Sequence, residues 1–335
     1  LFHGSGDKLT NEQEAAIEAM IDEPVTTRES SMLGRAKRLD NARTDYQWFC
    51  RNTVPRDADF SRLKVVIDCA HGAGYKVAPR VLGDLGATVI ALGCSPNGRN
   101  INQDVGSTRP DLLQATVRGV GADVGIALDG DGDRVVMVDD AGELVDGDQL
   151  IHILAVAAKE AGTLQGPVVG TVMSNLGLER SLEDRGIEFL RAPVGDRNVL
   201  SMLKQRGGLL GGETSGHVID LSRTTTGDGL VIALQVLHIL ARGSHRLSEL
   251  AAAMPRLPQT LLNVRVERGF DVDVSEEVRS VVDRVESELN GRGRVVLRAS
   301  GTEPVVRVMV EGDHEEVVAR AAETIAAAVR EAATG

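Results

Sequence analysis

The sequence has few cysteines, a shortage of positive charge and no long apolar run, and each deficit excludes a class of protein. Its 335 residues include only Cys50, Cys69 and Cys94, with no C-x-x-C pair, so we expect free thiols in a reducing cytoplasm rather than a disulfide scaffold. A net charge of −12 argues against nucleic acid as a partner, which requires a basic face. No run reaches the roughly 18 apolar residues of a membrane helix, so no membrane partner is expected.

The chain has enough length and apolar content for several cores. Hydrophobic residues make up 42% of it and charged residues 26%, which predicts two to four domains. The opening "LFHGSGDKLTNEQ" lacks the basic start and apolar core of a signal peptide and is typical of the middle of a domain. We therefore expect further residues upstream of it.

Periodicity and turn signals predict a series of α/β elements. The capping-box pattern "TNEQ" at Thr10 predicts a helix from about Asn11 to Ile21. A strand, turn, helix and strand begin at Leu63, and the same βαβ plan begins again at Val168. From about Leu261, alternating strands lead to a helix over about His314–Arg330, which we expect to be capped by Asp313.

The predicted fold class is α/β, with consecutive related βαβ-containing mixed-sheet domains and a smaller C-terminal α+β domain. A hinge is expected at the Pro255 and Pro258 stretch. The expected divisions are a truncated first domain with a linker helix, an α/β domain with a metal loop, an α/β domain with a sugar-binding loop and an α+β domain with a phosphate-binding loop: residues 1–60, 61–150, 151–256 and 257–335.

The stretch "LDGDGDR" follows a predicted strand and holds Asp129, Asp131 and Asp133 on alternate residues, with Arg134 directly after them. Three carboxylates on one turn repel each other without a cation, and hard oxygen ligands suit Mg²⁺ or Ca²⁺. An EF-hand is excluded, because its sixth position would be Arg134 and its twelfth Asp140. A solvated acidic turn remains the plain alternative. An arginine beside a metal favours a phosphoryl group that bridges the two.

Three other loops could contact a phosphorylated ligand. "RASGTEPVVRV" can surround a phosphate, and "GETSGH" and "VGDR" offer polar side chains near predicted strand ends. An ordinary hairpin, a polar loop and a surface ion pair are the respective alternatives. The candidates are Arg298, Ser300, Gly301, Thr302 and Arg307 in the first loop, Glu213, Ser215 and His217 in the second, and Asp196 and Arg197 in the third.

Taken in order, "DGDGDR", "VGDR", "GETSGH" and "RASGTEP" resemble the α-D-phosphohexomutase family over essentially the whole chain. Stretches such as "DCAHGAGYKVAPRVLGDLGA", "NINQDVGST" and "TTTGDG" resemble most its bacterial branch that acts on glucosamine phosphates. The resemblance implies an isomerase that interconverts glucosamine 6-phosphate and glucosamine 1-phosphate for amino-sugar and cell-wall precursor synthesis. It also implies a bisphosphate intermediate, here a hexosamine 1,6-bisphosphate that acts as activator.

The resemblance assigns roles to the candidate residues. Asp129, Asp131 and Asp133 would hold one Mg²⁺, and Arg134 would contact the phosphoryl group in transfer. The loop at 213–217 would bind the sugar, together with the pair at 196–197. The loop at 298–307 would hold the phosphate that is not reacting.

One family feature is missing. Members carry a phosphorylated serine in a T/S-A-S-H-N-P loop, and no such string occurs in this sequence. We therefore expect the chain as given to be inactive without an upstream serine. A phosphomannomutase or phosphoglucomutase, and a non-catalytic fragment that binds metal and sugar phosphate, stay open as alternatives. A homodimer is possible, because apolar surface around residues 1–60 would lack its usual cover.

Overall fold

A computed structural model describes residues 3–4, 8–267, 270, 275–299 and 304–334. The chain divides into two compact units, of which the first contains residues 1–144 and 217–244 and the second residues 145–216 and 245–335. Among the described residues, no helix combines the length and the apolar character needed to cross a bilayer.

The first unit contains a mixed sheet in the order β2-β1-β3-β4-β5. Strand β1 pairs in parallel with β2 and β3, and β4 runs antiparallel to β3. The elements are α1 (Asn11–Ile21), the 3-10 helix η1 (Ser30–Met32), α2 (Ala42–Asn52), β1 (Lys64–Asp68), the 3-10 helix η2 (Ala73–Lys76), α3 (Ala78–Asp84), β2 (Thr88–Leu92), α4 (Asp111–Val120), β3 (Val124–Leu128), β4 (Val135–Val138), β5 (Leu144–Val145), β9 (Val218–Asp220) and α8 (Gly229–Arg242).

The predicted βαβ unit after Leu63 is confirmed as β1, α3 and β2. Pro79 lies in the first turn of α3. Amides of the first turn have no acceptor within the helix, so the N–H that proline lacks costs no hydrogen bond there. All five residues of β3 are buried, as expected for a central strand covered on both faces. The carboxyl end of β3 therefore leads directly from the core into the aspartate loop.

The second unit repeats the βαβ plan, as predicted from Val168. Strand β6 pairs in parallel with β7 and with β8. The elements are α5 (Gly147–Glu160), β6 (Val168–Thr171), α6 (Leu176–Glu183), β7 (Phe189–Ala192), α7 (Asp196–Arg206), β8 (Leu210–Gly212), α9 (Leu247–Ala252), β10 (Gln259–Arg265), α10 (Glu276–Leu289), β11 (Gly293–Ala299), β12 (Val305–Gly312) and α11 (Glu315–Thr334).

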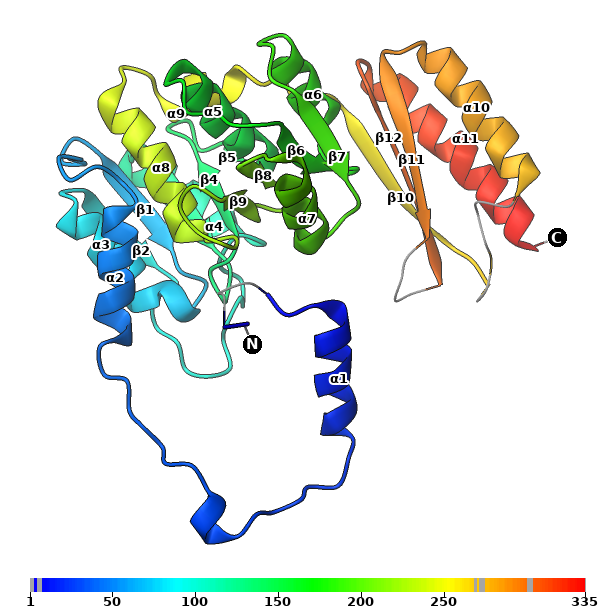
Figure 1. Ribbon diagram of the computed structural model, residues 1–335. Coiled ribbons are helices and arrows are strands. Elements are labelled where there is room, and N and C mark those ends of the chain that lie inside the picture. The colour runs from blue at the N-terminus through cyan, green and yellow to red at the C-terminus, as the bar shows by residue number, and fades with distance from the viewer. Residues whose placement is uncertain (1–2, 5–7, 268–269, 271–274, 300–303, 335) are drawn as a thin grey trace. The chain divides into compact units, whose positions relative to one another are not determined.

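The C-terminal part of this unit is an antiparallel sheet in the order β10-β12-β11, with α10 and α11 packed on one face (Figure 1). Alternate residues of each strand enter the core with these helices, including Val264, Val306 and Val308. The intervening residues, among them Arg298 and Arg307, therefore lie on the opposite face of the sheet. The predicted α+β organisation is confirmed.

Helix α11 begins one residue later than expected. It starts at Glu315, so that His314 and not Asp313 precedes its first residue. The carboxylate of Asp313 instead forms an ion pair with Arg180 at 2.8 Å. Asp313, which the sequence pattern predicted to cap α11, is therefore engaged in a tertiary ion pair.

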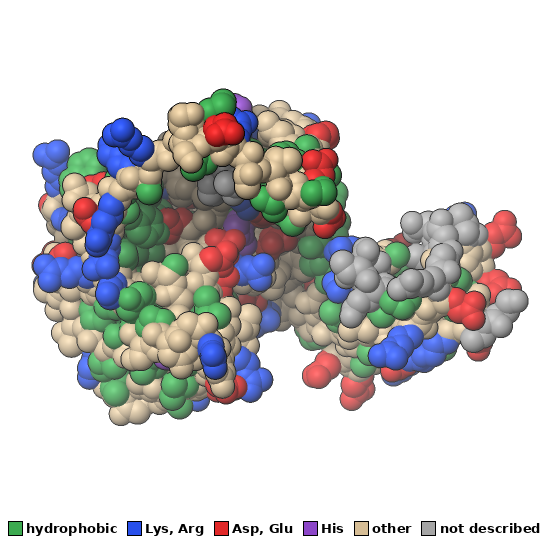
Figure 2. Space-filling view, turned by 90° about the horizontal axis from the view of Figure 1, so that it is seen from below, with side chains coloured by type: hydrophobic (Ala, Val, Ile, Leu, Met, Phe, Trp, Pro, Cys, Tyr) green, Lys and Arg blue, Asp and Glu red, His purple; other side chains and the backbone are tan. Residues whose placement is uncertain are grey.

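The helix predicted from "TNEQ" is confirmed as α1, with the Thr10 and Gln13 side chains forming the reciprocal capping box. No residue of α1 is buried. Further along, the Trp48 side chain on α2 is 71% exposed. Hydrophobic side chains lie among charged ones on the face in Figure 2. Association with a second copy through residues 1–60 stays a prediction.

His152 on α5 is an unusual member of the second unit's interior. The residue is 2% exposed, and neither ring nitrogen has a hydrogen-bond partner within the described part of the chain. Burial, and secondarily the positive charge of Arg185, lowers the pKa of His152 to about 4. The folded state therefore disfavours a proton that the unfolded chain binds below about pH 6.5.

Replacement of His152 should make the free energy of unfolding depend less on pH below about 6.5. Because the folded-state pKa is depressed, wild-type stability should fall as the pH drops from about 6.5 to 4, by up to about 3 kcal/mol. In His152→Leu this loss should be absent, as measured by urea unfolding at pH 7.5 and pH 5. An unchanged acid loss in His152→Leu would contradict the assignment.

Candidate active site

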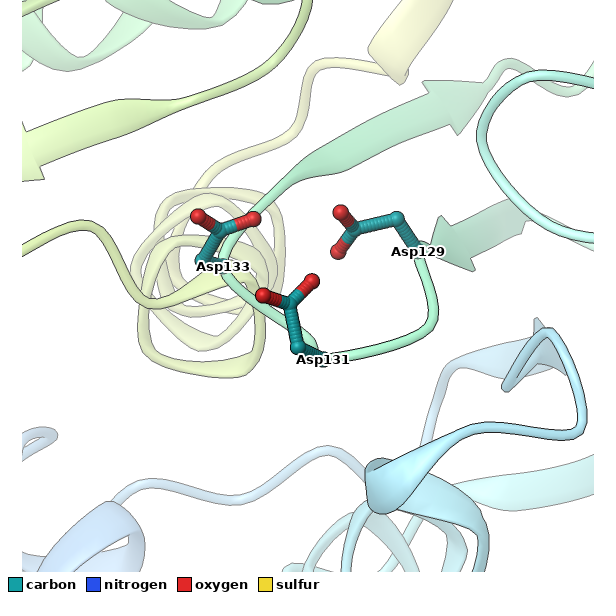
Figure 3. Close-up of side chains that lie close together, drawn as sticks. All are labelled: Asp129, Asp131 and Asp133. Atoms are coloured by element: carbon teal, nitrogen blue, oxygen red, sulfur yellow. The ribbon is translucent and has the colours of Figure 1, made fainter. Parts of the chain in front are cut away.

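The loop between β3 and β4 gathers three carboxylates. Asp129, Asp131 and Asp133 each offer an oxygen, and these oxygens all lie within 4.8 Å of one another. Figure 3 shows the three carboxylates converging on a common point. Gly132 adopts a left-handed φ of +79°, which a residue with a side chain rarely does, and so lets the loop curl between the second and third aspartates.

Asp129 is the innermost of the three, with its side chain 13% exposed. Its Oδ1 accepts hydrogen bonds from the amides of Gly132 and Arg134, both at 3.1 Å. Burial, opposed by the Arg134 amide and reinforced by the charges of Asp133 and Asp131, raises the pKa of Asp129 to about 6. A divalent cation would relieve this repulsion, and three carboxylate oxygens fit Mg²⁺.

Two neighbouring segments of the first unit hold this loop through main-chain hydrogen bonds. The carbonyl of Gly130 accepts a hydrogen bond from the Ala73 amide at 2.8 Å, and the carbonyl of Leu128 accepts one from Ser107 at 3.0 Å. A Cβ placed on Gly72 would lie 2.2 Å from the Gly130 oxygen. Only glycine at position 72 therefore lets the two main chains approach so closely.

A third support comes from "TTTGDG", a stretch that carries part of the family resemblance. The Gly229 amide donates to the Gly132 carbonyl at 2.9 Å, and a Cβ on Gly229 would lie 2.5 Å from the Arg134 oxygen. Asp228 caps α8 through the Val231 amide. Its second oxygen accepts a hydrogen bond from the Tyr46 hydroxyl at 2.8 Å. The metal loop thus rests on the start of a buried helix.

Arg134 and His217 flank the carboxylates. The Nε of Arg134 lies 3.9 Å from Asp133 Oδ1 and 4.0 Å from Asp129 Oδ2, with the side chain 45% exposed. The buried His217 places Nδ1 3.2 Å from Asp133 Oδ2. The sugar or phosphate contact expected of His217 stays a prediction, and in the structure its ring lies against a carboxylate of the predicted metal site. Such a contact orients the carboxylate.

The second unit carries the predicted sugar loop after β8. Glu213 and Ser215 lie on a tight turn, closed by a hydrogen bond from the Gly216 amide to the Glu213 carbonyl at 3.0 Å. The Glu213 carboxylate accepts a hydrogen bond from the Gly195 amide at 3.0 Å. Ser215 is exposed, so its hydroxyl is accessible to a ligand.

Asp196 and Arg197 occupy the first two positions of α7, after β7, where the sequence analysis expected a ligand-binding loop. Both are half-buried, and the Arg197 amide donates to the Asp196 carboxylate at 2.8 Å. The bond from Gly195 to Glu213 places this segment beside the sugar loop. Two of the predicted loops are therefore brought together in one unit.

The predicted phosphate loop is described only in part, because Ser300, Gly301 and Thr302 lie outside the described residues. Arg298 and Arg307 face each other as a cross-strand pair on β11 and β12. Among the described residues, neither guanidinium forms an ion pair with a carboxylate. Two like charges directly opposite each other destabilise a sheet. A bound phosphate would remove this cost and accept hydrogen bonds from both guanidinium groups.

Family models of phosphoglucomutase/phosphomannomutase match most of the chain. Alpha/beta/alpha domain II matches residues 49–142, alpha/beta/alpha domain III matches 146–257, and the C-terminal domain matches 261–328. A phosphoglucosamine mutase of Alkalilimnicola ehrlichii is 53% identical over 99% of this chain and 73% of its own length. The chain belongs to the phosphoglucomutase/phosphomannomutase family. A phosphoglucosamine mutase of Proteus mirabilis is 52% identical over 98% of the chain and 74% of its own length.

Solved structures have the same fold. A phosphoglucomutase/phosphomannomutase family protein of Burkholderia thailandensis matches with a TM-score of 0.75 at 23% identity, over 98% of this chain and 72% of that one. An N-acetylphosphoglucosamine mutase of Aspergillus fumigatus, solved with GlcNAc-6P and magnesium, matches with a TM-score of 0.71 at 21% identity, over 88% and 66% of the two chains. The predicted fold class is confirmed.

Two further residues hold the predicted sugar loop, and neither was predicted from the sequence patterns. Thr214 lies between Glu213 and Ser215, and its hydroxyl donates to the buried Asp148 at 2.8 Å. A signal for Thr214 was available: if alternate loop residues face a ligand, the residue between them faces the support. No local pattern indicates Asp148, because it lies 66 positions away along the chain.

A side chain at position 72 should disrupt the metal loop. Gly72→Ala would place a Cβ 2.2 Å from the backbone oxygen of Gly130, so the loop must shift and the three carboxylates must lose their convergence. We expect Mg²⁺ affinity, measured by calorimetry, to fall by at least about tenfold, the lower end of the effect of altered metal-site supports.

Gly83→Ala is the matched control for this prediction. A Cβ at position 83 in α3 would meet nothing within 4 Å. That variant should bind Mg²⁺ as wild type and gain up to about 1 kcal/mol of stability from helix propensity. Equal metal affinity in both variants would show that the Gly72 approach does not shape the site.

Proposed function

We propose that this chain carries the metal, sugar and phosphate sites of an isomerase that interconverts glucosamine 6-phosphate and glucosamine 1-phosphate. The convergence of Asp129, Asp131 and Asp133 beside Arg134 carries the proposal, because it suits a phosphoryl group between a cation and a guanidinium. The sugar specificity is supported by relatives 52% and 53% identical that are named phosphoglucosamine mutase. The A. fumigatus neighbour, solved with GlcNAc-6P and magnesium, supports the ligand class.

Each group has a separate task in this mechanism. Bound Mg²⁺ supplies positive charge for the phosphoryl group in transfer. Arg134 donates hydrogen bonds to the same phosphoryl oxygens, and His217 keeps Asp133 oriented. Glu213 and Ser215 bind sugar hydroxyls, with Asp196 and Arg197 beside them. The non-reacting phosphate is bound by Arg298, Ser300, Gly301, Thr302 and Arg307.

The reaction consists of two phosphoryl transfers, the first from the enzyme to one position of the sugar and the second from the other position of the sugar back to the enzyme. A phosphoserine loses its phosphoryl group to one hydroxyl of the sugar phosphate, which gives a hexosamine 1,6-bisphosphate. The bisphosphate turns over and returns its other phosphoryl group to the serine. The same bisphosphate, added in catalytic amount, acts as the activator. Fixed positions for the sugar and the distal phosphate supply much of the acceleration in each transfer.

Two alternatives belong with the proposal, and the second follows from the absence of the family's serine-bearing string from this sequence. One is a phosphomannomutase or phosphoglucomutase with the same sites but another sugar preference. The other is a non-catalytic fragment that binds Mg²⁺ and sugar phosphates. The free thiols of Cys50, Cys69 and Cys94 support a reducing compartment such as the cytoplasm.

The deciding test is turnover of the 335-residue chain on glucosamine 6-phosphate with Mg²⁺ and hexosamine 1,6-bisphosphate. We expect no turnover by the chain alone and restored turnover when a segment bearing the family's serine loop is added. Turnover by the chain alone would mean that another residue carries the phosphoryl group. A strong preference for mannose or glucose phosphate in the restored system would favour a phosphomannomutase or phosphoglucomutase. No turnover even with the added segment would favour a non-catalytic fragment.

Arg134 should act on the transition state rather than on metal binding. In the restored system, Arg134→Gln should lower kcat by about 10²–10³-fold, the usual effect of removing one donor to the developing charge. Mg²⁺ affinity should stay within about twofold, since Arg134 contributes no metal ligand. The exposed Arg80, paired with Asp84 on α3, provides the control Arg80→Gln, which should keep full activity. A kcat unchanged in Arg134→Gln would refute this role.

A further inference from the structure

Thr214 differs from its two neighbours in the sugar loop. Ser215 is exposed, and the Glu213 carboxylate binds the Gly195 amide at 3.0 Å. The Thr214 hydroxyl instead donates to Oδ2 of Asp148 at 2.8 Å. Glu213 and Ser215 are therefore available to a ligand, whereas Thr214 between them is hydrogen-bonded to the protein.

Asp148 is a carboxylate in an unfavourable place. It lies in the first turn of α5 and is fully buried. Its Oδ2 accepts two hydrogen bonds, from Thr214 and from the Asn175 amide at 2.8 Å, and its Oδ1 has no partner within the described residues. Burial, and then the charge of Asp146, raises the pKa of Asp148 to about 6. Burial of such a group costs stability, so a role in function is worth testing.

The main chain of the loop lies directly on the start of α5. The Gly147 amide donates to the Thr214 carbonyl at 3.1 Å, and a Cβ on Gly147 would lie 2.0 Å from the Glu213 oxygen. Side-chain and main-chain contacts from positions 147 and 148 therefore converge on the same two loop residues. Together they determine where Glu213 and Ser215 can point.

The other partner of Asp148 is itself firmly attached. The Asn175 side chain exchanges two hydrogen bonds, both 3.0 Å, with the main chain of Leu257. The next amide, that of Leu176, donates to the buried Glu311 of β12 at 3.1 Å. Since β12 also carries Arg307, the sugar loop and a phosphate-binding strand have a common support within the second unit.

We propose that Asp148 is a positioning residue for the sugar ring of the substrate. Through Thr214 it fixes the turn at residues 213–216, so that Glu213 and Ser215 meet the hydroxyl groups of a hexose phosphate in one orientation. This inference rests on the proposed function for the identity of the ligand. The attachment of the loop to Asp148 does not depend on that identity.

The test uses variants that change one hydrogen bond and keep the shape. Thr214→Val removes the hydroxyl, Thr214→Ser keeps it, and Asp148→Asn keeps one oxygen for both donors. Thr163→Val is the matched control, since Thr163 is exposed and, within the described part of the chain, its hydroxyl bonds only to the Ala158 carbonyl. Two properties of the 335-residue chain are measured: amide exchange at Gly216 without ligand, and affinities for glucosamine 6-phosphate and inorganic phosphate.

Thr214→Val should speed Gly216 exchange and weaken glucosamine 6-phosphate binding by about tenfold, the equivalent of one hydrogen bond to a charged group. Affinity for inorganic phosphate should stay within about twofold of wild type, a selectivity that general loss of stability would not produce. Thr214→Ser and Thr163→Val should resemble wild type in both measurements, and Asp148→Asn, which keeps the acceptor oxygen but loses the charge, should fall between wild type and Thr214→Val.

Two outcomes would overturn the inference: unchanged Gly216 exchange in Thr214→Val, or equal losses of affinity for sugar phosphate and inorganic phosphate. Failure of the proposed function looks different. In that case the unmodified chain would bind glucosamine 6-phosphate no better than inorganic phosphate, while the exchange measurement would still show whether Asp148 fixes the loop.

Discussion

Repulsion among three carboxylates on one short loop is the constraint on which the rest of the first unit depends. Asp129, Asp131 and Asp133 converge within 4.8 Å, and Asp129 is also largely withdrawn from water. A loop with this charge would open if it were free, because separation and hydration both lower its energy. The protein opposes this with amide donors to Asp129 and with main-chain contacts at both loop glycines, 130 and 132. The loop is thereby preorganised for a cation.

The supporting contacts are main chain to main chain, and this explains where glycine is required. At position 72 a Cβ would lie 2.2 Å from a backbone oxygen, and at position 229 it would lie 2.5 Å from another. A flexible side chain could move aside, but a backbone carbonyl in a close-packed interior moves only with the segment that carries it. The sugar loop uses the same device at Gly147. Both units thus hold their loops by close approach of backbone, and the second unit adds the buried carboxylate of Asp148.

Much of the fold was predictable, because its signals are local. The repeated strand, helix and strand plans, the capping box at Thr10 and the alternating strands of the C-terminal sheet depend on residues a few positions apart. The predictions that were wrong or missing involve distant partners. Asp313 pairs with Arg180 rather than capping α11. The contact between His217 and Asp133 was missing from the sequence predictions, because the two residues lie far apart along the chain.

The sequence by itself determined the spacing of the three aspartates and of Arg134, and this spacing alone brings their charges onto one turn. It also placed Arg298 and Arg307 on strands joined by a short loop, where they can face each other. Only the tertiary structure decided what holds these groups: Gly72 below the metal loop, Asp228 with Tyr46 at the start of α8, and Asp148 beneath Thr214. The reason is chain separation, since the Asp148–Thr214 contact spans 66 positions and the Tyr46–Asp228 contact 182. Residues so far apart are brought together only by the tertiary fold, and no local pattern encodes such pairs.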